Sequence, residues 1–161
     1  MKSISAQAID KVIESLDNLS DEQYEAKMQA FTDAQPVLIA YLFHEENFHL
    51  LSEEERGFMQ YLALIAWLAI DAEFGEVGMV DEQAIGEAEE ANFEALENST
   101  GKNFRKRLDP LFEGYAQEEL LAFAEEAVLE DEDDPDGIIS KEGRETIFVA
   151  IKTVIDVLTE E

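Results

Sequence analysis

The residues whose types and spacing most suggest a binding or catalytic role lie in an acidic stretch, EDEDDPDGIISKEG, that runs from residue 130 to 143. Carboxylates at alternate positions around a glycine are typical of a calcium-binding loop, which places oxygen ligands at positions 1, 3, 5, 7 and 9, glycine at position 6 and a bidentate glutamate at position 12. Such a loop would hold Ca²⁺ between two helices. The candidate ligands are Asp131, Asp133, Asp134, Asp136 and Glu142.

Neither register of this stretch completes the loop. With Gly137 at position 6, position 12 falls on Gly143, which has no side-chain oxygen, and Glu142 arrives one residue early. With Asp131 at position 1, Glu142 reaches position 12, but Pro135 occupies position 5. The first interpretation is therefore a hydrated acidic connector whose like charges hold it extended. The alternative is a weak calcium site of another geometry that uses the same carboxylates.

The only two histidines give a second candidate, in the segment FHEENFH at 43–49. The zinc-protease motif H-E-x-x-H needs histidines four residues apart, whereas His44 and His49 would lie roughly 140° apart around a helix. Glu46 and His49 have the spacing of a di-iron carboxylate motif, but that site needs a second such motif, and no other histidine exists. One interpretation is a helix end at which Glu46 and His49 face water. The alternative is a mononuclear metal site formed by Glu46, His49 and Asp71.

Other signatures of catalysis are missing from the sequence. There is no cysteine, no nucleophile elbow and no glycine-rich phosphate loop. Asp71 and Glu73 follow an apolar segment and would suit acid–base work if buried, but in a chain with 39 acidic residues a nearby pair carries little information. The sequence anchors no catalytic constellation, so we lean against an enzyme.

The formal net charge of −28 is the strongest global property of the chain. It argues against binding to nucleic acid, because phosphates require lysines and arginines along one face. The basic cluster KNFRKR at 102–107 is too small for that role and is expected to pair with acidic neighbours. Three interpretations of the acidity remain: a solvated surface, recognition of a basic protein, and adaptation to high salt.

Length and hydropathy favour one domain that covers residues 1–161, as a monomer or a homodimer. No run reaches the roughly 18 apolar residues of a membrane-spanning helix, and the longest, GFMQYLALIAWLAI at 57–70, predicts a central core helix. No signal-peptide pattern is visible, and without cysteine there is no disulfide framework. We therefore expect a cytoplasmic protein that does not associate with a membrane.

The spacing of apolar residues is helical nearly throughout, so the predicted fold class is all-α, a compact bundle of about seven helices. Ser20 with Gln23, and Ser52 with Glu55, have the spacing of capping boxes, and Asp81 can cap a later helix. The predicted helical segments cover about residues 4–18, 20–32, 37–43, 52–72, 82–97, 103–113, 116–130 and 141–159.

Two segments, 61–83 and 120–142, align without gaps as a weak helix–loop–helix pseudo-repeat. Each contains an apolar helix, an acidic connector, a glycine and then a capping residue, Asp81 or Ser140. Two such units are compatible with a pair of calcium-binding hands, but the upstream copy has Gly75 where an oxygen ligand belongs. Common descent of the two segments therefore does not follow from their alignment.

These observations predict a non-catalytic protein-interaction or adaptor domain with an acidic recognition surface that binds a basic or apolar partner surface. An apolar groove beside carboxylates would favour this function. One alternative is a calcium-binding module that uses residues 131–142. The other is an acidic mimic of nucleic acid that binds a basic protein.

Overall fold

The all-α prediction is confirmed by a computed structural model of the chain, which describes residues 2–75, 77–130 and 137–159. Within these ranges the chain forms eight α-helices and one 3-10 helix, and no strand. In chain order the elements are α1 (Ala6–Asp17), α2 (Asp21–Ala34), α3 (Pro36–Phe43), η1 (Glu45–Phe48), α4 (Glu53–Phe74), α5 (Glu82–Glu97), α6 (Phe104–Phe112), α7 (Glu118–Leu129) and α8 (Lys141–Thr159).

The predicted caps set where three of these helices begin. Both capping boxes form: the Ser52 N–H donates to Glu55 Oε1 at 2.9 Å and the Glu55 N–H donates to Ser52 Oγ at 3.1 Å, and Ser20 and Gln23 exchange the equivalent bonds. Asp81 accepts from the N–H of the third residue of α5 at 2.8 Å. Each cap satisfies backbone donors that a helix start leaves without partners.

The elements depart from the prediction in one place. Helix α6 has nearly the predicted bounds and contains Pro110 in its last turn. Element η1 was not predicted, and it inserts a tight turn between α3 and α4. The His44 side chain caps η1, since its Nδ1 accepts from the Glu46 N–H at 3.3 Å.

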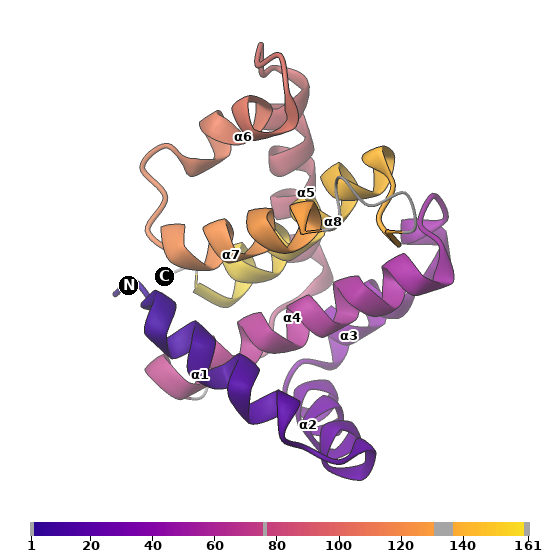
Figure 1. Cartoon of the computed structure of the whole chain (residues 1–161), viewed down its shortest axis with the longest axis vertical. Coiled ribbons are helices and arrows are strands. Elements are labelled where there is room, and N and C mark those ends of the chain that lie inside the picture. The colour runs from indigo at the N-terminus through magenta and orange to yellow at the C-terminus, as the bar shows by residue number, and fades with distance from the viewer. Residues whose placement is uncertain (1, 76, 131–136, 160–161) are drawn as a thin grey trace.

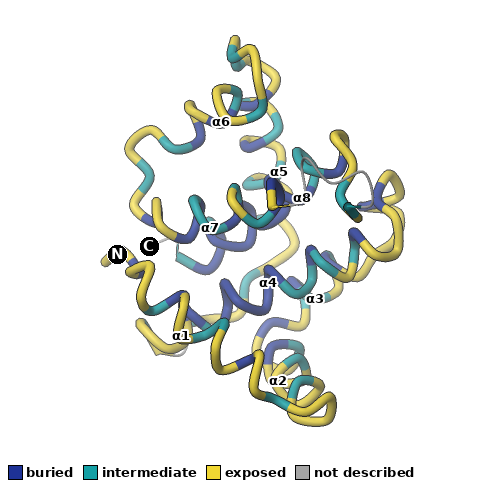
Figure 2. Tube along the Cα trace, in the orientation of Figure 1, coloured by how far each residue is buried: buried dark blue, intermediate teal, exposed yellow. Residues whose placement is uncertain are grey.

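The core has two central helices, α4 and α8. Helix α8 packs against α4, α5 and α7, and α4 also packs against α1. The apolar face of α8 is wholly enclosed, and burial continues around most of the helix (Figure 2). By length and composition α4 alone among the described helices would be able to cross a membrane, and here it is the core helix that the sequence predicts.

The remaining helices extend the molecule in both directions from this core. Helix α6 lies at one end of the long axis and α2 at the other, with α4, α7 and α8 between them (Figure 1). The N-terminal segment is fixed on the core by Gln117, whose Oε1 accepts from the Ile4 N–H at 3.0 Å and whose Nε2 donates to the Lys2 carbonyl at 2.8 Å. Ile4 is thereby fully buried ahead of α1.

In each half of the pseudo-repeat, a side chain caps the helix that follows the connector. Ser140 precedes α8 as Asp81 precedes α5, and its Oγ accepts from the Gly143 N–H at 2.9 Å. In the first connector the left-handed backbone conformation lies at Gly75, with φ of 75°, where α4 ends. The aligned glycine of this connector, Gly78, does not have a positive φ, so it does not supply the turn.

Candidate functional site

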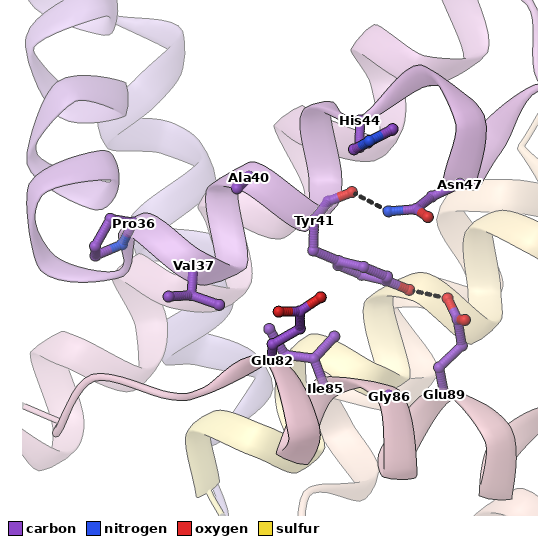
Figure 3. Close-up of a pocket in the computed structure, with 10 residues that line it drawn as sticks. All are labelled: Pro36, Val37, Ala40, Tyr41, His44, Asn47, Glu82, Ile85, Gly86 and Glu89. Carbon is purple, nitrogen blue, oxygen red and sulfur yellow. Dashed lines mark hydrogen bonds between the residues drawn. The ribbon is translucent and has the colours of Figure 1, made fainter.

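A groove between α3 and α5, closed at one end by the segment around η1, forms a cavity (Figure 3). We call it the α3–α5 groove. Its volume is about 630 Å³, within the range of roughly 300–1,000 Å³ typical of ligand pockets. It is lined by Pro36, Val37, Ala40, Tyr41, His44, Asn47, Glu82, Ile85, Gly86 and Glu89.

The groove follows from the helical period on each wall. The lining positions 82, 85, 86 and 89 have the i, i+3, i+4, i+7 spacing of one face of α5. On α3, positions 36, 37, 40 and 41 form the facing wall. At Gly86 a Cβ atom would meet nothing within 4 Å, so the missing side chain leaves the groove open along α5.

Tyr41 and Glu89 join the two walls. The Tyr41 hydroxyl donates a short hydrogen bond to Glu89 Oε2 (Figure 3). Burial raises the pKa of Tyr41 strongly, and the hydrogen bond and the negative charge of Glu89 raise it further. The phenol therefore stays protonated and acts as a fixed donor, and the Asn47 side chain donates to the Tyr41 carbonyl at 3.2 Å.

The lining of the groove determines what it can do chemically. Apolar groups of Pro36, Val37 and Ile85 form much of its surface, while the carboxylates of Glu82 and Glu89 are its charged groups. The described lining residues include no lysine or arginine. The groove is thus suited to bind a group that is apolar and positively charged, and it holds no nucleophile paired with a base.

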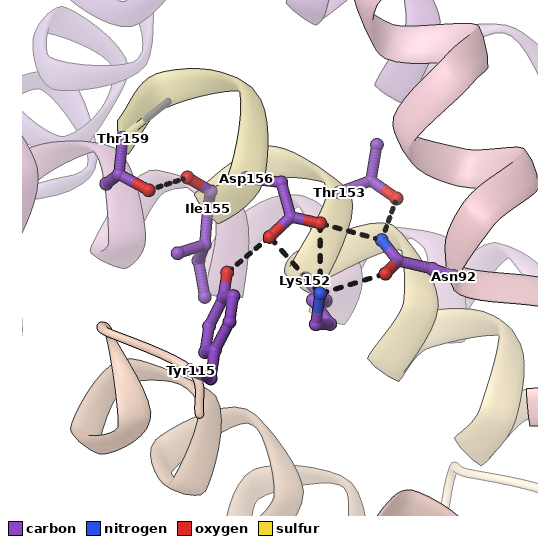
Figure 4. Close-up of polar contacts among 7 residues, drawn as sticks. All are labelled: Asn92, Tyr115, Lys152, Thr153, Ile155, Asp156 and Thr159. Carbon is purple, nitrogen blue, oxygen red and sulfur yellow. Dashed lines mark hydrogen bonds and ion pairs between the residues drawn. The ribbon is translucent and has the colours of Figure 1, made fainter. Parts of the chain in front are cut away.

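A buried polar cluster joins α5, α8 and the loop before α7 (Figure 4). Lys152 is only 8% exposed. Its Nζ donates to Asn92 Oδ1 at 2.9 Å and to Asp156 Oδ2 at 3.1 Å. Asn92 Nδ2 donates to Asp156 Oδ2 at 3.0 Å and to Thr153 Oγ1 at 3.2 Å. The cluster therefore fixes the packing of α5 on α8.

Tyr115 covers the same cluster from the loop. Its hydroxyl donates to Asp156 Oδ1 at 2.5 Å, and Lys152 Nζ lies 4.4 Å from the centre of its ring. Burial raises the pKa of Tyr115, as do the charge and hydrogen bond of Asp156. Because these groups satisfy one another and are enclosed, the cluster organises the core. Its one signal in the sequence is a lysine and an aspartate four residues apart inside an apolar helix.

A second buried carboxylate, Glu55, joins the starts of α4 and α8. Besides its bond to Ser52, its Oε2 accepts from Ser140 N and from Ser140 Oγ, each at 3.0 Å. Burial alone would raise the pKa of Glu55, but the hydrogen bonds from Ser52 and Ser140 outweigh burial and lower it. A Cβ at Gly143 would lie 2.0 Å from Glu55 Oε2, so a larger residue here would have to displace this carboxylate.

Most of the predicted calcium ligands lie outside the described residues, namely Asp131, Asp133, Asp134 and Asp136. Glu142 is exposed in the first turn of α8. Where the structure describes the chain, no three potential ligands come together as a metal site. The calcium loop therefore stays a prediction.

The alternative site of Glu46, His49 and Asp71 is not assembled among the described residues. His49 Nδ1 lies 3.3 Å from the Glu46 carbonyl oxygen, so these two meet through the backbone of η1. Asp71 instead lines a separate cavity near the end of α4. Glu73 is paired with Lys2 at 3.4 Å and is partly exposed, which does not favour an acid–base pair with Asp71.

Two residues of the basic cluster, Arg105 and Arg107, pair with acidic neighbours, as predicted. Arg105 Nη1 lies 2.6 Å from Glu125 Oε1 and 3.0 Å from Glu126 Oε1, both on α7. Arg107 Nε lies 3.2 Å from Glu145 Oε1 on α8. These pairs orient α6 on its neighbours, and exposed pairs of this kind contribute about 0–1 kcal/mol each.

Comparison with known proteins adds no function to this geometry. No protein-family model matches the chain, and no curated protein or solved structure is similar to it.

Proposed function

We propose that the protein is a non-catalytic protein-interaction domain whose α3–α5 groove binds a basic, amphipathic helix of a partner protein. The observation that supports this function is the groove itself, which places apolar walls directly beside the carboxylates of Glu82 and Glu89. A helix that offers apolar residues at i, i+3, i+4 and i+7 is recognised in such grooves. Lysines or arginines on its flanks would meet the acidic rim.

Charge complementarity supports a basic occupant over a neutral one. With 39 acidic residues against 11 basic ones, the protein attracts cationic partners over several ångströms of solution. That field accelerates encounter with any basic chain and does not by itself select one. Selection therefore depends on the apolar walls, where desolvated contacts form the centre of an interface.

The test uses a fluorescein-labelled helical peptide of leucine and lysine, about four turns long, with leucines at the spacing given above. We expect saturable binding, measured by fluorescence anisotropy, at roughly physiological ionic strength. The variant Gly86→Leu projects a side chain into the open groove. Because it occupies the space of the peptide, it should weaken binding by about tenfold or more.

Gly57→Leu is the matched control. Gly57 is an exposed helical glycine of α4 where an added Cβ would meet nothing within 4 Å, and it does not line the groove. Equal binding by the Gly57→Leu and Gly86→Leu variants would refute the groove as the binding site. Equal binding of a peptide with scrambled leucines, or of polylysine, would show recognition of charge alone, which is the behaviour of a nucleic-acid mimic.

A further inference from the structure

A second cavity, of about 440 Å³, lies where α2 and α4 end. We call it the Trp67 pocket. Among the described residues it shares no lining residue with the α3–α5 groove. It is lined by Asp33, Ala34, Trp67, Asp71, Val77, Gly78 and Met79.

The electrostatics of this pocket favour a cation. Asp33 lies in the last turn of α2 and Asp71 in the last turn of α4, and neither last turn contains a basic residue. The C-terminal end of a helix carries a partial negative charge, so an added carboxylate there is unfavourable unless a cation is near. Asp33 accepts only from the neutral Gln29 amide, at 2.8 Å, and no described lysine or arginine pairs with either carboxylate.

Trp67 supplies an aromatic surface. It lies one turn before Asp71 on α4, and its ring stacks on Phe31 with centroids 5.0 Å apart. The residue is only 8% exposed and its side chain lines the pocket. The pocket therefore offers an aromatic surface beside two carboxylates.

The wall opposite the helices is held in place. Gln35 is fully buried between α2 and α3, and its Nε2 donates to the Gly78 carbonyl at 3.0 Å while its Oε1 accepts from the Val80 N–H at 3.0 Å. Met79, between these anchors, is 63% exposed. The pocket is therefore preformed, which lowers the entropic cost of binding.

From these features we infer that the Trp67 pocket binds the side chain of an arginine residue in a partner peptide. The guanidinium is always charged, is weakly hydrated and presents five donors to carboxylates, here Asp33 and Asp71. Its aliphatic stem would lie against Trp67 and Met79. A lysine side chain is more strongly hydrated and is expected to bind less tightly.

The site can be tested directly because Trp67 is the single tryptophan of the chain. N-acetyl-arginine amide is titrated into the full-length protein at constant ionic strength while tryptophan emission is recorded. We expect a saturable change, with a dissociation constant on the order of millimolar for one side chain. N-acetyl-citrulline amide, which has nearly the same shape without the charge, should give no saturation in the same range.

Two variants test the carboxylates and one is a control. Asp33→Asn and Asp71→Asn should each weaken binding by about tenfold, while Asp10→Asn on α1 removes an equal charge and should leave it unchanged. The Tm of both pocket variants should be unchanged or higher, because each loses a carboxylate from a helix C-terminus. An emission change that does not saturate, that citrulline reproduces, or that persists undiminished in both variants would overturn the proposal.

Discussion

Replacing Glu55 with glutamine tests whether one carboxylate joins two distant helix starts. Glu55 accepts from Ser52 N with one oxygen, and from Ser140 N and Oγ with the other. An amide keeps one acceptor oxygen, so in either orientation the Ser52 donor or both Ser140 donors lose their partner. The substitution is nearly isosteric, and its effect therefore reports on these bonds.

The size of the stability loss distinguishes the loss of a local helix cap from the loss of a bond between two helices. A helix cap alone contributes about 1 kcal/mol. A hydrogen bond to a charged group contributes about 1.5–3 kcal/mol, and a buried donor left without a partner costs a similar amount. With Glu55 only 4% exposed, we expect Glu55→Gln to lower the free energy of unfolding by about 3 kcal/mol, measured by urea denaturation at neutral pH.

The effect should depend on pH in a defined direction. Because the folded pKa of Glu55 lies below its ordinary value of 4.5, the carboxylate stabilises the fold above that pH and loses this contribution as the pH falls through the folded pKa. The difference in stability between the wild-type protein and Glu55→Gln should therefore shrink in acid. Comparing the two at each pH removes the effect of the other carboxylates, which both proteins share.

Gly143→Ala provides an independent check on the same contact. The added methyl would lie 2.0 Å from Glu55 Oε2, so it must displace the carboxylate and should destabilise the wild-type protein. In a Glu55→Ala background the same methyl has more room, and its cost should be smaller. A loss of about 1 kcal/mol or less for Glu55→Gln, together with an equal effect of Gly143→Ala in both backgrounds, would refute the proposed link between α4 and α8.

Three further substitutions and one control are measured by urea denaturation. Lys152→Met should cost about 1.5–3 kcal/mol, because the partly buried Asp156 loses its cation but keeps the hydrogen bonds from Asn92 and Tyr115, and a loss below about 1 kcal/mol would mean that the cluster is solvated. Gln117→Ala should cost about 1–2 kcal/mol and speed hydrogen exchange at the Ile4 amide; unchanged exchange would contradict the anchor. Gly101→Ala should cost about 1–3 kcal/mol, since its Cβ would lie 2.4 Å from the α6 backbone, whereas Gly57→Ala should gain about 0.5–1 kcal/mol; a gain at both positions would contradict this packing.

Local sequence determined the helices themselves. Caps such as Ser52 and Asp81 act on donors within three residues of their own position, so their spacing alone predicts where α4 and α5 begin. The apolar stripe of α8 is likewise a property of successive turns, and the structure buries it as predicted. Helix α6 keeps nearly its predicted bounds with Pro110 inside it, so one unfavourable residue did not override the pattern of the whole helix.

Tertiary structure alone decided which residues, distant in the sequence, become partners across the helices. Nothing local relates Tyr41 to Glu89, or Glu55 to Ser140, because these partners are 48 and 85 residues apart. The acidic composition predicted an acidic surface, but a carboxylate becomes part of a groove or pocket only when two helices converge on it. Local spacing therefore defines each helix and its faces, while the choice of facing neighbour depends on the burial of all the helices at once.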